Sequence, residues 1–499
     1  MAELCIQKSF ARFGNFDAIS EVAVAGAPDH ARSIGSGGVA PVRILSAGRQ
    51  CPHRRFGRAG SARLSRLSLG SNYSDLDGDD ATMSPHEAIP SWSIVALATA
   101  GVIIRPFRVP EAVWALAGVA VLLLLGLLPV DDAIGGIAKG IDVYLFLIGM
   151  MLIAELAQRE GLFDYLAAFA VEHARGSPQR LFLLVYAVGI LVTVFLSNDA
   201  TAIVLTPAVY AATRAAGAKP LPYLFACAFI ANAASFVLPI SNPANLVVFG
   251  DRMPHLTEWL RQFALPSLAA ILATYIVLRL TQRGALSEEK IETSVPTPHL
   301  SHGGKLAAIG IAAVGAVLVT ASALDIRLGL PTFLCGLITT AAVLGLSRQS
   351  PWPVLKGVSW GVVPLVAGLF VMVEALVRTG VIGHLSALLH DAVAQSPSRT
   401  AWGAGLITSI ADNVANNLPV GLVAGSVAAQ NHLPPEVVGA MLIGVDLGPN
   451  LSVTGSLATI LWLVALRRQK IEVTAWRFLQ IGALVTPPAL VAALAALIW

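Results

Sequence analysis

The stretch DVYLFLIGMMLIAELAQREGLFDYL (Asp142–Leu166) has a counterpart 219 positions further along the chain, GVVPLVAGLFVMVEALVRTGVIGHL (Gly361–Leu385). The identical pairs at this offset are Gly149 with Gly368, Glu155 with Glu374, Arg159 with Arg378, and Gly161 with Gly380. Both stretches are apolar for most of their length and turn polar toward the end. A pattern that returns once over such a distance predicts a chain built from two structural repeats.

The composition indicates that much of this chain lies in lipid. Hydrophobic residues make up 56% of its 499 residues, charged residues make up 13%, and the mean hydropathy is +0.72. Apolar runs that can cross a ~30 Å hydrocarbon layer recur from about residue 91 to the end. We therefore predict an all-α polytopic membrane protein with roughly ten to twelve crossings. Its expected surroundings are the lipid bilayer, with no nucleic-acid partner.

Two polar segments divide the chain. Residues 1–82 contain nine arginines and no apolar run that could span a membrane or serve as a secretory signal. We expect a disordered basic extension that is dispensable for activity, or coding sequence upstream of a true start at Met83. Residues 283–305 are polar and punctuated by Pro and Gly, so they are predicted to link a first membrane half (91–282) to a second (306–499). The Lys and Arg residues around this linker favour the cytoplasmic side.

The cysteines give no sign of a metal or disulfide site. Cys5 and Cys51 lie in the N-terminal extension, and Cys227 and Cys335 lie in opposite membrane halves without the spacing of a ligand cluster. The chain also has no Gly-rich loop that ends in Lys-Ser or Lys-Thr, so ATP hydrolysis by this chain is not expected. We predict no cofactor, no metal site and no enzymatic activity.

Polar side chains interrupt one apolar segment in each half. In the first half Asn198, Asp199 and Thr201 lie between Phe195 and Pro207. The counterpart in the second half, near an offset of 215, carries Asp412, Asn413, Asn416 and Asn417. An unpaired amide or carboxylate costs several kcal/mol in hydrocarbon, so these side chains must face protein, water or a ligand. Because such residues compete with helical hydrogen bonds, we predict a re-entrant hairpin whose break lines a cavity.

A second interruption combines helix-breaking residues with polar ones. Pro239 and Pro243 each remove a backbone donor within the tract that ends at Asn245. The partner tract, at an offset of 214, contains Gly448-Pro449 and Gly455. We predict one broken transmembrane helix per half. Inverted repeats follow if an odd number of crossings separates corresponding elements.

The polar breaks of the two halves are expected to meet near the bilayer midplane and to form one substrate site. The residues assigned to this site are Asn198, Asp199, Thr201, Ser241, Asn242, Asn245, Asn413, Asn416, Asn417, Asp446, Ser456 and Thr459.

Coupling to protons requires a titratable group in the pathway. Asp199 is the first candidate because no Lys or Arg lies within ten positions of it, and Asp446 and Asp412 are further candidates. Glu155 and Glu374 each precede an arginine by four residues and are interpreted as Glu–Arg pairs on one helix face. The acidic pair at 131–132 follows Pro129 and is interpreted as surface.

The chain from about Trp92 to Trp499 resembles the arsenical pump membrane proteins of the ArsB type, in the ion transporter superfamily. The residues that carry the resemblance are Ser197-Asn198-Asp199 with Ile203–Pro207, Ser241–Asn245, Asn416–Pro419, and Ile443–Asn450 with Gly455–Trp462. The resemblance implies a multi-pass protein of the bacterial cytoplasmic (inner) membrane that exports arsenite and antimonite, driven by protons. It also implies that a separate ATPase subunit can take part in some members.

Substrate chemistry leaves two classes of transporter open. Arsenite is mostly a neutral trihydroxide at neutral pH, and Asn, Ser and Thr side chains with unwound backbone suit it. The alternative is a sodium/proton antiporter or a dicarboxylate carrier on the same scaffold. A di-acid carrier should place a cation or a repeated Ser-Asn-Thr at the breaks, and both breaks of the first half lack the Thr.

Overall fold

The computed structural model describes residues 85–287, 291–292, 299–430 and 433–499, and its regular elements there are all helical. The extension predicted at residues 1–82 lies outside the described residues. The elements of the first repeat are α2 (Pro85–Ile104), η1 (Pro106–Arg108), α3 (Glu111–Leu124), α4 (Val130–Lys139), α5 (Ile141–Arg159), α6 (Leu162–Ala174), α7 (Pro178–Phe195), α8 (Asn198–Ala200), η2 (Thr201–Leu205), α9 (Thr206–Ala215), α10 (Leu221–Ala233), η3 (Pro239–Ser241), α11 (Pro243–Phe249), η4 (Gly250–Arg252) and α12 (Leu256–Thr281).

The second repeat contains counterparts of the main helices in the same order, with the single helix α20 in place of α8, η2 and α9. Its elements are α14 (His302–Ala323), α15 (Gly329–Ser347), α16 (Trp352–Gly357), α17 (Val362–Arg378), α18 (Val381–Gln395), α19 (Pro397–Ala415), α20 (Asn417–Gln430), α21 (Pro435–Leu447), η5 (Gly448–Asn450), α22 (Leu457–Arg468) and α23 (Ala475–Ile498). The predicted linker at 283–305 contains the short helix α13 (Arg283–Ser287) and the first turn of α14.

Local sequence explains why equivalent helices start at equivalent places. Ser177 and Ser396 cap α7 and α19, and each side chain accepts a hydrogen bond from the backbone N–H three residues on. Both serines are followed by Pro at the first helical position, where the missing N–H costs nothing. Gly161 and Gly380 precede α6 and α18 with φ of 75° and 78°, a conformation that favours glycine.

Six helices in the described residues are long and apolar enough to cross a membrane: Ile141–Arg159, Pro178–Phe195, Leu256–Thr281, His302–Ala323, Gly329–Ser347 and Ala475–Ile498. The pair α17 and α18, bent by 73° at its break, makes a seventh if it counts as one span. Large apolar side chains such as Leu97, Leu124 and Ile407 are exposed on the helices, as lipid contact requires. The chain is thus an all-α, multi-pass membrane protein. Its predicted ten to twelve crossings would need shorter and broken helices to be counted, and that number stays a prediction.

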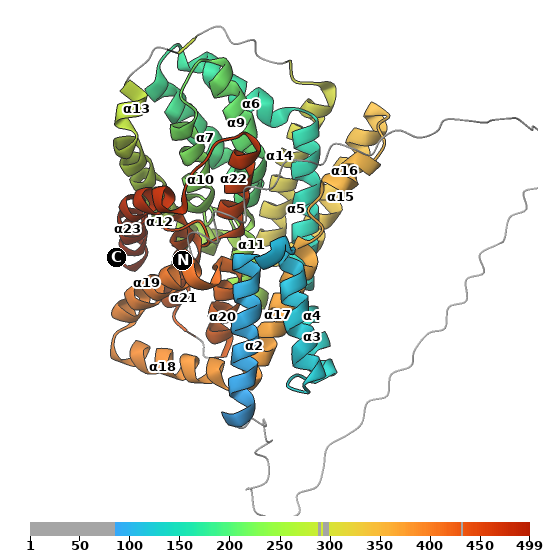
Figure 1. The fold of residues 1–499 in the computed structure, drawn as a ribbon, viewed down its shortest axis with the longest axis vertical. Helices are drawn as coiled ribbons and strands as arrows, with labels where there is room; N and C mark the ends of the chain where they lie inside the picture. Colours follow the sequence, from blue (N-terminus) through green and yellow to red (C-terminus); the bar gives the residue numbers. More distant parts are fainter. Residues whose placement is uncertain (1–84, 288–290, 293–298, 431–432) are drawn as a thin grey trace, which may run out of the picture. The chain divides into compact units, whose positions relative to one another are not determined.

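The two repeats pack against each other reciprocally (Figure 1). Helix α5 packs along α15, and its counterpart α17 packs along α3, the counterpart of α15. In the same way α11 packs against α20, while α22 packs against η2 and α9. The closing helices α12 and α23 pack on each other. This exchange of equivalent contacts indicates a pseudo-two-fold axis between the repeats. Their inversion across the membrane stays a prediction.

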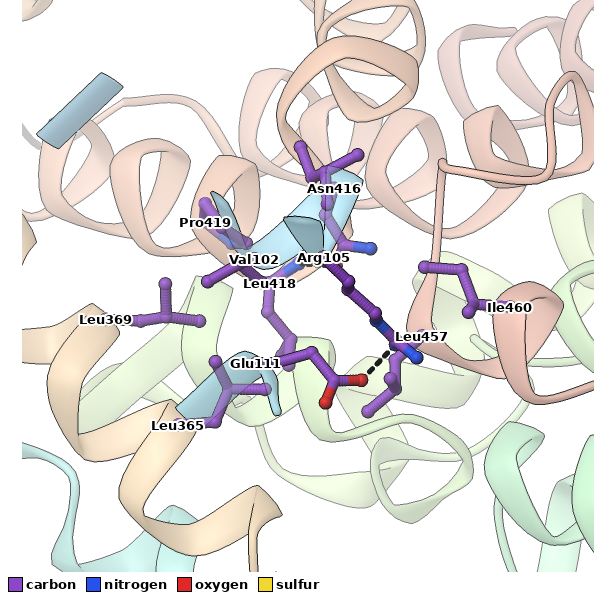
Figure 2. Close-up of a pocket in the computed structure, with 11 residues that line it drawn as sticks. Val102, Arg105, Glu111, Leu365, Leu369, Asn416, Leu418, Pro419, Leu457 and Ile460 are labelled. Carbon is purple, nitrogen blue, oxygen red and sulfur yellow. Dashed lines mark hydrogen bonds and ion pairs between the residues drawn. The ribbon is translucent and has the colours of Figure 1, made fainter. Parts of the chain in front are cut away.

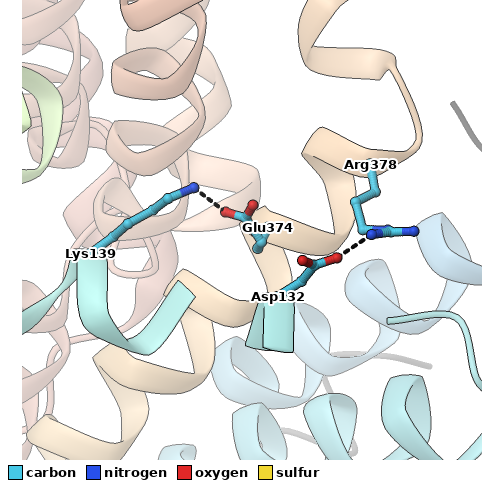
Figure 3. A network of polar contacts seen from close by, with 4 residues as sticks. All are labelled: Asp132, Lys139, Glu374 and Arg378. Atoms are coloured by element: carbon cyan, nitrogen blue, oxygen red, sulfur yellow. Dashed lines mark hydrogen bonds and ion pairs between the residues drawn. The ribbon is translucent and has the colours of Figure 1, made fainter. Parts of the chain in front are cut away.

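Charged residues at the contact between α4 and α17 correct one part of the sequence analysis (Figure 3). Glu155 and Arg159 form the expected pair within α5, with Nε and Oε1 2.6 Å apart. The prediction of an equivalent Glu374–Arg378 pair within α17 is wrong. Glu374 instead binds Lys139 of α4 at 2.6 Å, and Arg378 pairs with Asp132 of α4. Of the acidic pair interpreted as surface, Asp131 is exposed, whereas Asp132 is partly exposed and takes part in this contact.

Candidate functional site

The first break separates α7 from the helical segment that starts at Asn198. Ser197 is extended, and its hydroxyl accepts a hydrogen bond from the N–H of Ala200 at 3.2 Å. The Asn198 side chain accepts from the N–H of Asp199 at 2.9 Å. The π-helical segment η2 follows directly, and such segments are frequent at functional sites. The helix after the break therefore begins with N–H groups that Ser197 and Asn198 cap.

The second repeat contains the matching break between α19 and α20. Asn416 joins the two helices with φ of 72° and ψ of 151°, a strained conformation that residues other than glycine rarely adopt. Its side-chain amide donates to the Thr454 carbonyl at 3.2 Å, and the N–H of Asn417 donates to the Gly455 carbonyl at 2.9 Å. These bonds tie the start of α20 to the loop that precedes α22.

The other two breaks use side chains to replace lost helical hydrogen bonds. Asn242 caps α11 by accepting from the N–H of Ala244 at 3.1 Å. Asn245 donates its amide to three carbonyls of the unwound segment, the nearest at 2.8 Å, on Ser235. In the second repeat Ser456 caps α22 by accepting from the N–H of Thr459 at 3.1 Å. The two loops are thus held open by the polar residues that the sequence places there.

The four breaks converge on one small pocket between the repeats. The residues that line it are Leu147, Asn198, Asp199, Asn242, Pro243, Val362, Asn417, Leu418, Leu457 and Ala458. They come from the starts of α8, α11, α20 and α22, with one apolar residue each from α5 and from α17. The helix dipole makes such starts slightly positive. The lining contains one charged side chain, that of Asp199, and no Lys or Arg.

The predicted site residues fall into two layers around this pocket. Asn198, Asp199, Asn242 and Asn417 line it. The remaining predicted residues, which support the pocket or its neighbourhood without lining it, are Thr201, Ser241, Asn245, Asp412, Asn413, Asn416, Asp446, Ser456 and Thr459. Asn413 links α19 to η5, since its amide donates to the carbonyls of Ser409 at 2.8 Å and Gly448 at 3.0 Å.

One hydrogen bond joins the two layers and the two repeats. The amide of Asn242 donates to Oδ1 of Asp446 at 2.6 Å, while Oδ2 of Asp446 is buried without a hydrogen-bond partner in the described residues. Both carboxylate oxygens of Asp412 are in the same condition, and Asp412 lies close enough to interact electrostatically with Asp446. Asp199 is partly exposed, and its carboxylate forms none of the hydrogen bonds or ion pairs found in the described part of the chain. Three carboxylates therefore lie at or behind the pocket without a cationic partner.

The structure changes the register assigned to the first pair of breaks. Asn198 corresponds to Asn417 at an offset of 219, rather than to Asn413 at 215, because both begin the helix after the break. The offset between α10 and α21 is 214, so the first repeat has five additional residues between its break and α10. The sequence comparison at an offset of 215 placed this length difference before the break, whereas the structure places it after the break. The offset of 214 for the second pair holds, since Asn242 and Ser456 are equivalent caps.

A second pocket, which the sequence analysis missed, is drawn in Figure 2, and it shares two lining residues with the first pocket. It is lined by Val102, Ile103, Arg105, Glu111, Leu365, Leu369, Asn416, Leu418, Pro419, Leu457 and Ile460. Leu418 and Leu457 belong to both pockets. Arg105 and Glu111 form an ion pair from the turn between α2 and α3. The sequence could have indicated this ion pair, because the two residues are six positions apart. A short charged turn does not, however, show which helices pack against it.

Two repeats of membrane-spanning helices, each broken by polar residues at a shared pocket, define a secondary transporter. The family described as "Citrate transporter" (CitMHS) matches residues 95–444, and the chain belongs to this family. It is similar to an uncharacterized transporter of Mycobacterium tuberculosis strain H37Rv, with 28% identity over 79% of this chain and 94% of that protein. The arsenical pump membrane protein of Escherichia coli is 27% identical over 70% of this chain and 84% of that protein.

A solved structure supports the fold. The YdaH transporter of Alcanivorax borkumensis, whose crystal structure is described as having an unusual topology, aligns with a TM-score of 0.52 and 15% identity. The alignment covers 83% of this chain and 98% of that one. The resemblance to arsenical pump membrane proteins is therefore confirmed, and the matched family and relatives are transporters rather than enzymes.

Proposed function

We propose that this chain exports arsenite, and also antimonite, from the bacterial cytoplasm across the inner membrane in exchange for protons. Its arsenical pump relatives and its matching site motifs support this proposal. The twelve residues assigned from the sequence form the transport site and its support. Asn198, Asp199, Asn242 and Asn417 contact the substrate in this scheme.

The observation that carries the proposal is the charge of the central pocket. Its polar side chains are three amides and one carboxylate, with no Lys or Arg. A trianion such as citrate would be placed beside Asp199 without a cation to offset the repulsion. A neutral trihydroxide instead finds the hydrogen-bond donors and acceptors of the three amides. A hydrogen-bonded substrate of this kind can also dissociate readily.

Asp199 is the residue we assign to proton exchange. It lies in the pocket, and a proton and a substrate can compete there for the same carboxylate. Asp446 reaches the pocket through Asn242, and Asp412 lies behind it, so both are secondary candidates. A separate ATPase subunit is compatible with this scheme but is not needed for it.

The second candidate is uptake of a carboxylate, which the description of the matching family favours. The missing positive charge would then have to arrive with the substrate, as a divalent cation bound to it. A sodium/proton antiporter is a third use of the same scaffold. Sodium-dependent transport, or transport of citrate only with a divalent metal, would favour these alternatives.

A direct test uses a bacterium that lacks its own arsenite exporter. Cells that express this chain should tolerate more arsenite and accumulate less of it than cells with an empty vector, and Asn417→Leu should abolish the difference. Everted vesicles should take up arsenite when a pH gradient is imposed, and a protonophore should stop the uptake. Equal accumulation in expressing and control cells, with the chain shown to be in the membrane, would contradict the proposal.

A further inference from the structure

The pocket of Arg105 and Glu111 lies directly beside the candidate substrate site. Leu418 at the start of α20 and Leu457 at the start of α22 line both pockets, so these two side chains form a shared wall. Asn416, which precedes α20, lines the second pocket, while its neighbour Asn417 lines the first. A solute in the second pocket is therefore separated from the polar site by leucine side chains at two helix starts, elements that a small shift can displace.

The charges in this second pocket neutralise each other. Apart from Arg105, Glu111 and Asn416, its lining is apolar. The Arg105 and Glu111 side chains are 24% and 22% exposed and form an ion pair, and Nε of Arg105 is buried with no hydrogen-bond partner among the described residues. Figure 2 shows the two side chains pointing toward each other, with Leu365 and Leu369 on one side and Leu457 and Ile460 on the other. In apolar surroundings an unpaired charge attracts or repels other ions strongly, whereas the field of a paired charge is largely cancelled by its partner.

Left-handed residues shape the turn that carries this pair, and the corresponding turn of the second repeat also contains one, Asp325 with φ of 56°. Arg105 has φ of 50°, and Phe107, in the same turn, has φ of 58°. Left-handed conformations at residues other than glycine are costly and gather at functional sites. In the corresponding turn of the second repeat, Asp325 pairs with His255 at 2.9 Å, and both side chains are well exposed. The two turns therefore differ in exposure: the Arg105–Glu111 pair is partly buried on the side that faces α20 and α22, whereas the Asp325–His255 pair is exposed.

We propose that this second pocket is an entrance to the substrate site and that the Arg105–Glu111 pair is its charge filter, with Glu111 a specificity-determining residue that excludes anions. With Glu111 in place the entrance is electrically neutral and admits small uncharged solutes. Without it the Arg105 guanidinium is unpaired and attracts anions into the pocket. This inference extends the proposed function, because a neutral entrance favours arsenious acid over carboxylates, but it can be tested without any transported substrate.

The test measures how reagents of different charge reach a cysteine in the entrance. Ile460→Cys is introduced into a full-length background in which Cys5, Cys51, Cys227 and Cys335 are replaced by serine or alanine. The purified protein is treated with methanethiosulfonates that carry a neutral methyl, an anionic sulfonatoethyl or a cationic trimethylammonioethyl group. The readout is the rate at which the anionic or the cationic reagent modifies this cysteine, divided by the rate for the neutral reagent.

We expect Glu111→Gln to raise the anionic ratio at least tenfold and Arg105→Gln to raise the cationic ratio instead. The variant that carries both changes should return close to the starting ratios. The matched control is Ser350→Cys, at an exposed loop position, whose ratios should not respond. Because the two single variants shift in opposite directions, either one suffices if the other does not fold.

Ratios that stay within twofold of the starting values in every folded variant would overturn the filter. A cysteine at 460 that reacts with none of the reagents would overturn the entrance. Failure of arsenite transport together with the expected ratios would overturn the proposed function alone.

Discussion

The hydrogen bond from Asn242 to Asp446 should be a measurable link between the two repeats. Asn242→Ala removes two interactions, the cap on the N–H of Ala244 and the 2.6 Å bond to Oδ1 of Asp446. Loss of a cap costs about 1 kcal/mol. Loss of the second bond removes the Asn242 donor from a buried carboxylate whose Oδ2 has no partner among the described residues, which costs about 1–3 kcal/mol in soluble proteins and about 0.6–1.7 kcal/mol in membranes. The total expected loss in the free energy of unfolding is about 2–3 kcal/mol.

The assay is the midpoint of thermal unfolding in detergent or nanodiscs, arranged as a double-mutant cycle. For a helical region of about 400 residues, 1 kcal/mol corresponds to roughly 1 °C, so Asn242→Ala should lower the midpoint by about 2–3 °C. Asp446→Asn keeps an oxygen acceptor and removes the charge, so by itself it should cost less. Added to Asn242→Ala, it should restore about 1 °C, because the orphaned group is then neutral.

Ser456→Ala is the matched control for this cycle. Ser456 is the equivalent cap in the second repeat, and its hydroxyl bonds within its own helix start rather than to Asp446. Its effect should therefore add to that of Asp446→Asn without coupling. If the changes in unfolding midpoint caused by Asn242→Ala and Asp446→Asn simply add in the double variant, within the error of the Ser456 control, the proposed link is refuted.

Three further predictions concern coupling, packing and the contact between α4 and α17. Asp199→Asn should still bind arsenite, seen as a raised unfolding midpoint with ligand, yet everted vesicles should show no transport driven by a pH gradient; a wild-type rate would exclude Asp199 from coupling. Gly336→Ala should destabilise by about 1–3 kcal/mol, because the new Cβ would lie 2.6 Å from the Gly149 carbonyl oxygen, whereas Gly345→Ala on the same helix meets no neighbour within 4 Å and should be neutral or stabilising; equal midpoints for the two variants would contradict this. Lys139→Glu should cost at most about 1 kcal/mol, since the Lys139 side chain is 63% exposed, and Glu374→Lys should restore that loss; a double variant no more stable than the single one would show that the pair contributes nothing.

Much of the fold could be predicted because its decisive interactions are local. Proline, glycine and asparagine break helices through their own backbone chemistry, so the tract that ends at Asn245 and its partner around Gly448 could be identified without tertiary information. The same holds for the Glu155–Arg159 pair, which needs only one turn of helix.

The features that the sequence analysis got wrong or missed depend on packing between distant segments. Glu374 has the same local pattern as Glu155, but α4 presents Lys139 to it, whereas α16 presents Gly357 to Glu155. The pair of Arg105 and Glu111 acquires meaning only where α20 and α22 begin beside it. The register of the Asn417 break was hidden by the five-residue length difference between the repeats.

The repeats are equivalent in backbone but not in charge, and this difference gives coupling a physical basis. By the offsets of the structure, Asp199 corresponds to Leu418, Asp412 to Thr193, and Asp446 to Asn232, so no carboxylate at the site has a carboxylate as its mate. If alternating access exchanges the environments of the two repeats, a symmetric set of charges would leave a proton equally bound in both states. An asymmetric set makes protonation favour one state over the other, and a ligand shifts an equilibrium only through such a difference in affinity. The Asn242–Asp446 hydrogen bond joins the two repeats at this asymmetric set of charges. We therefore expect protonation of Asp446 to alter the pocket through Asn242.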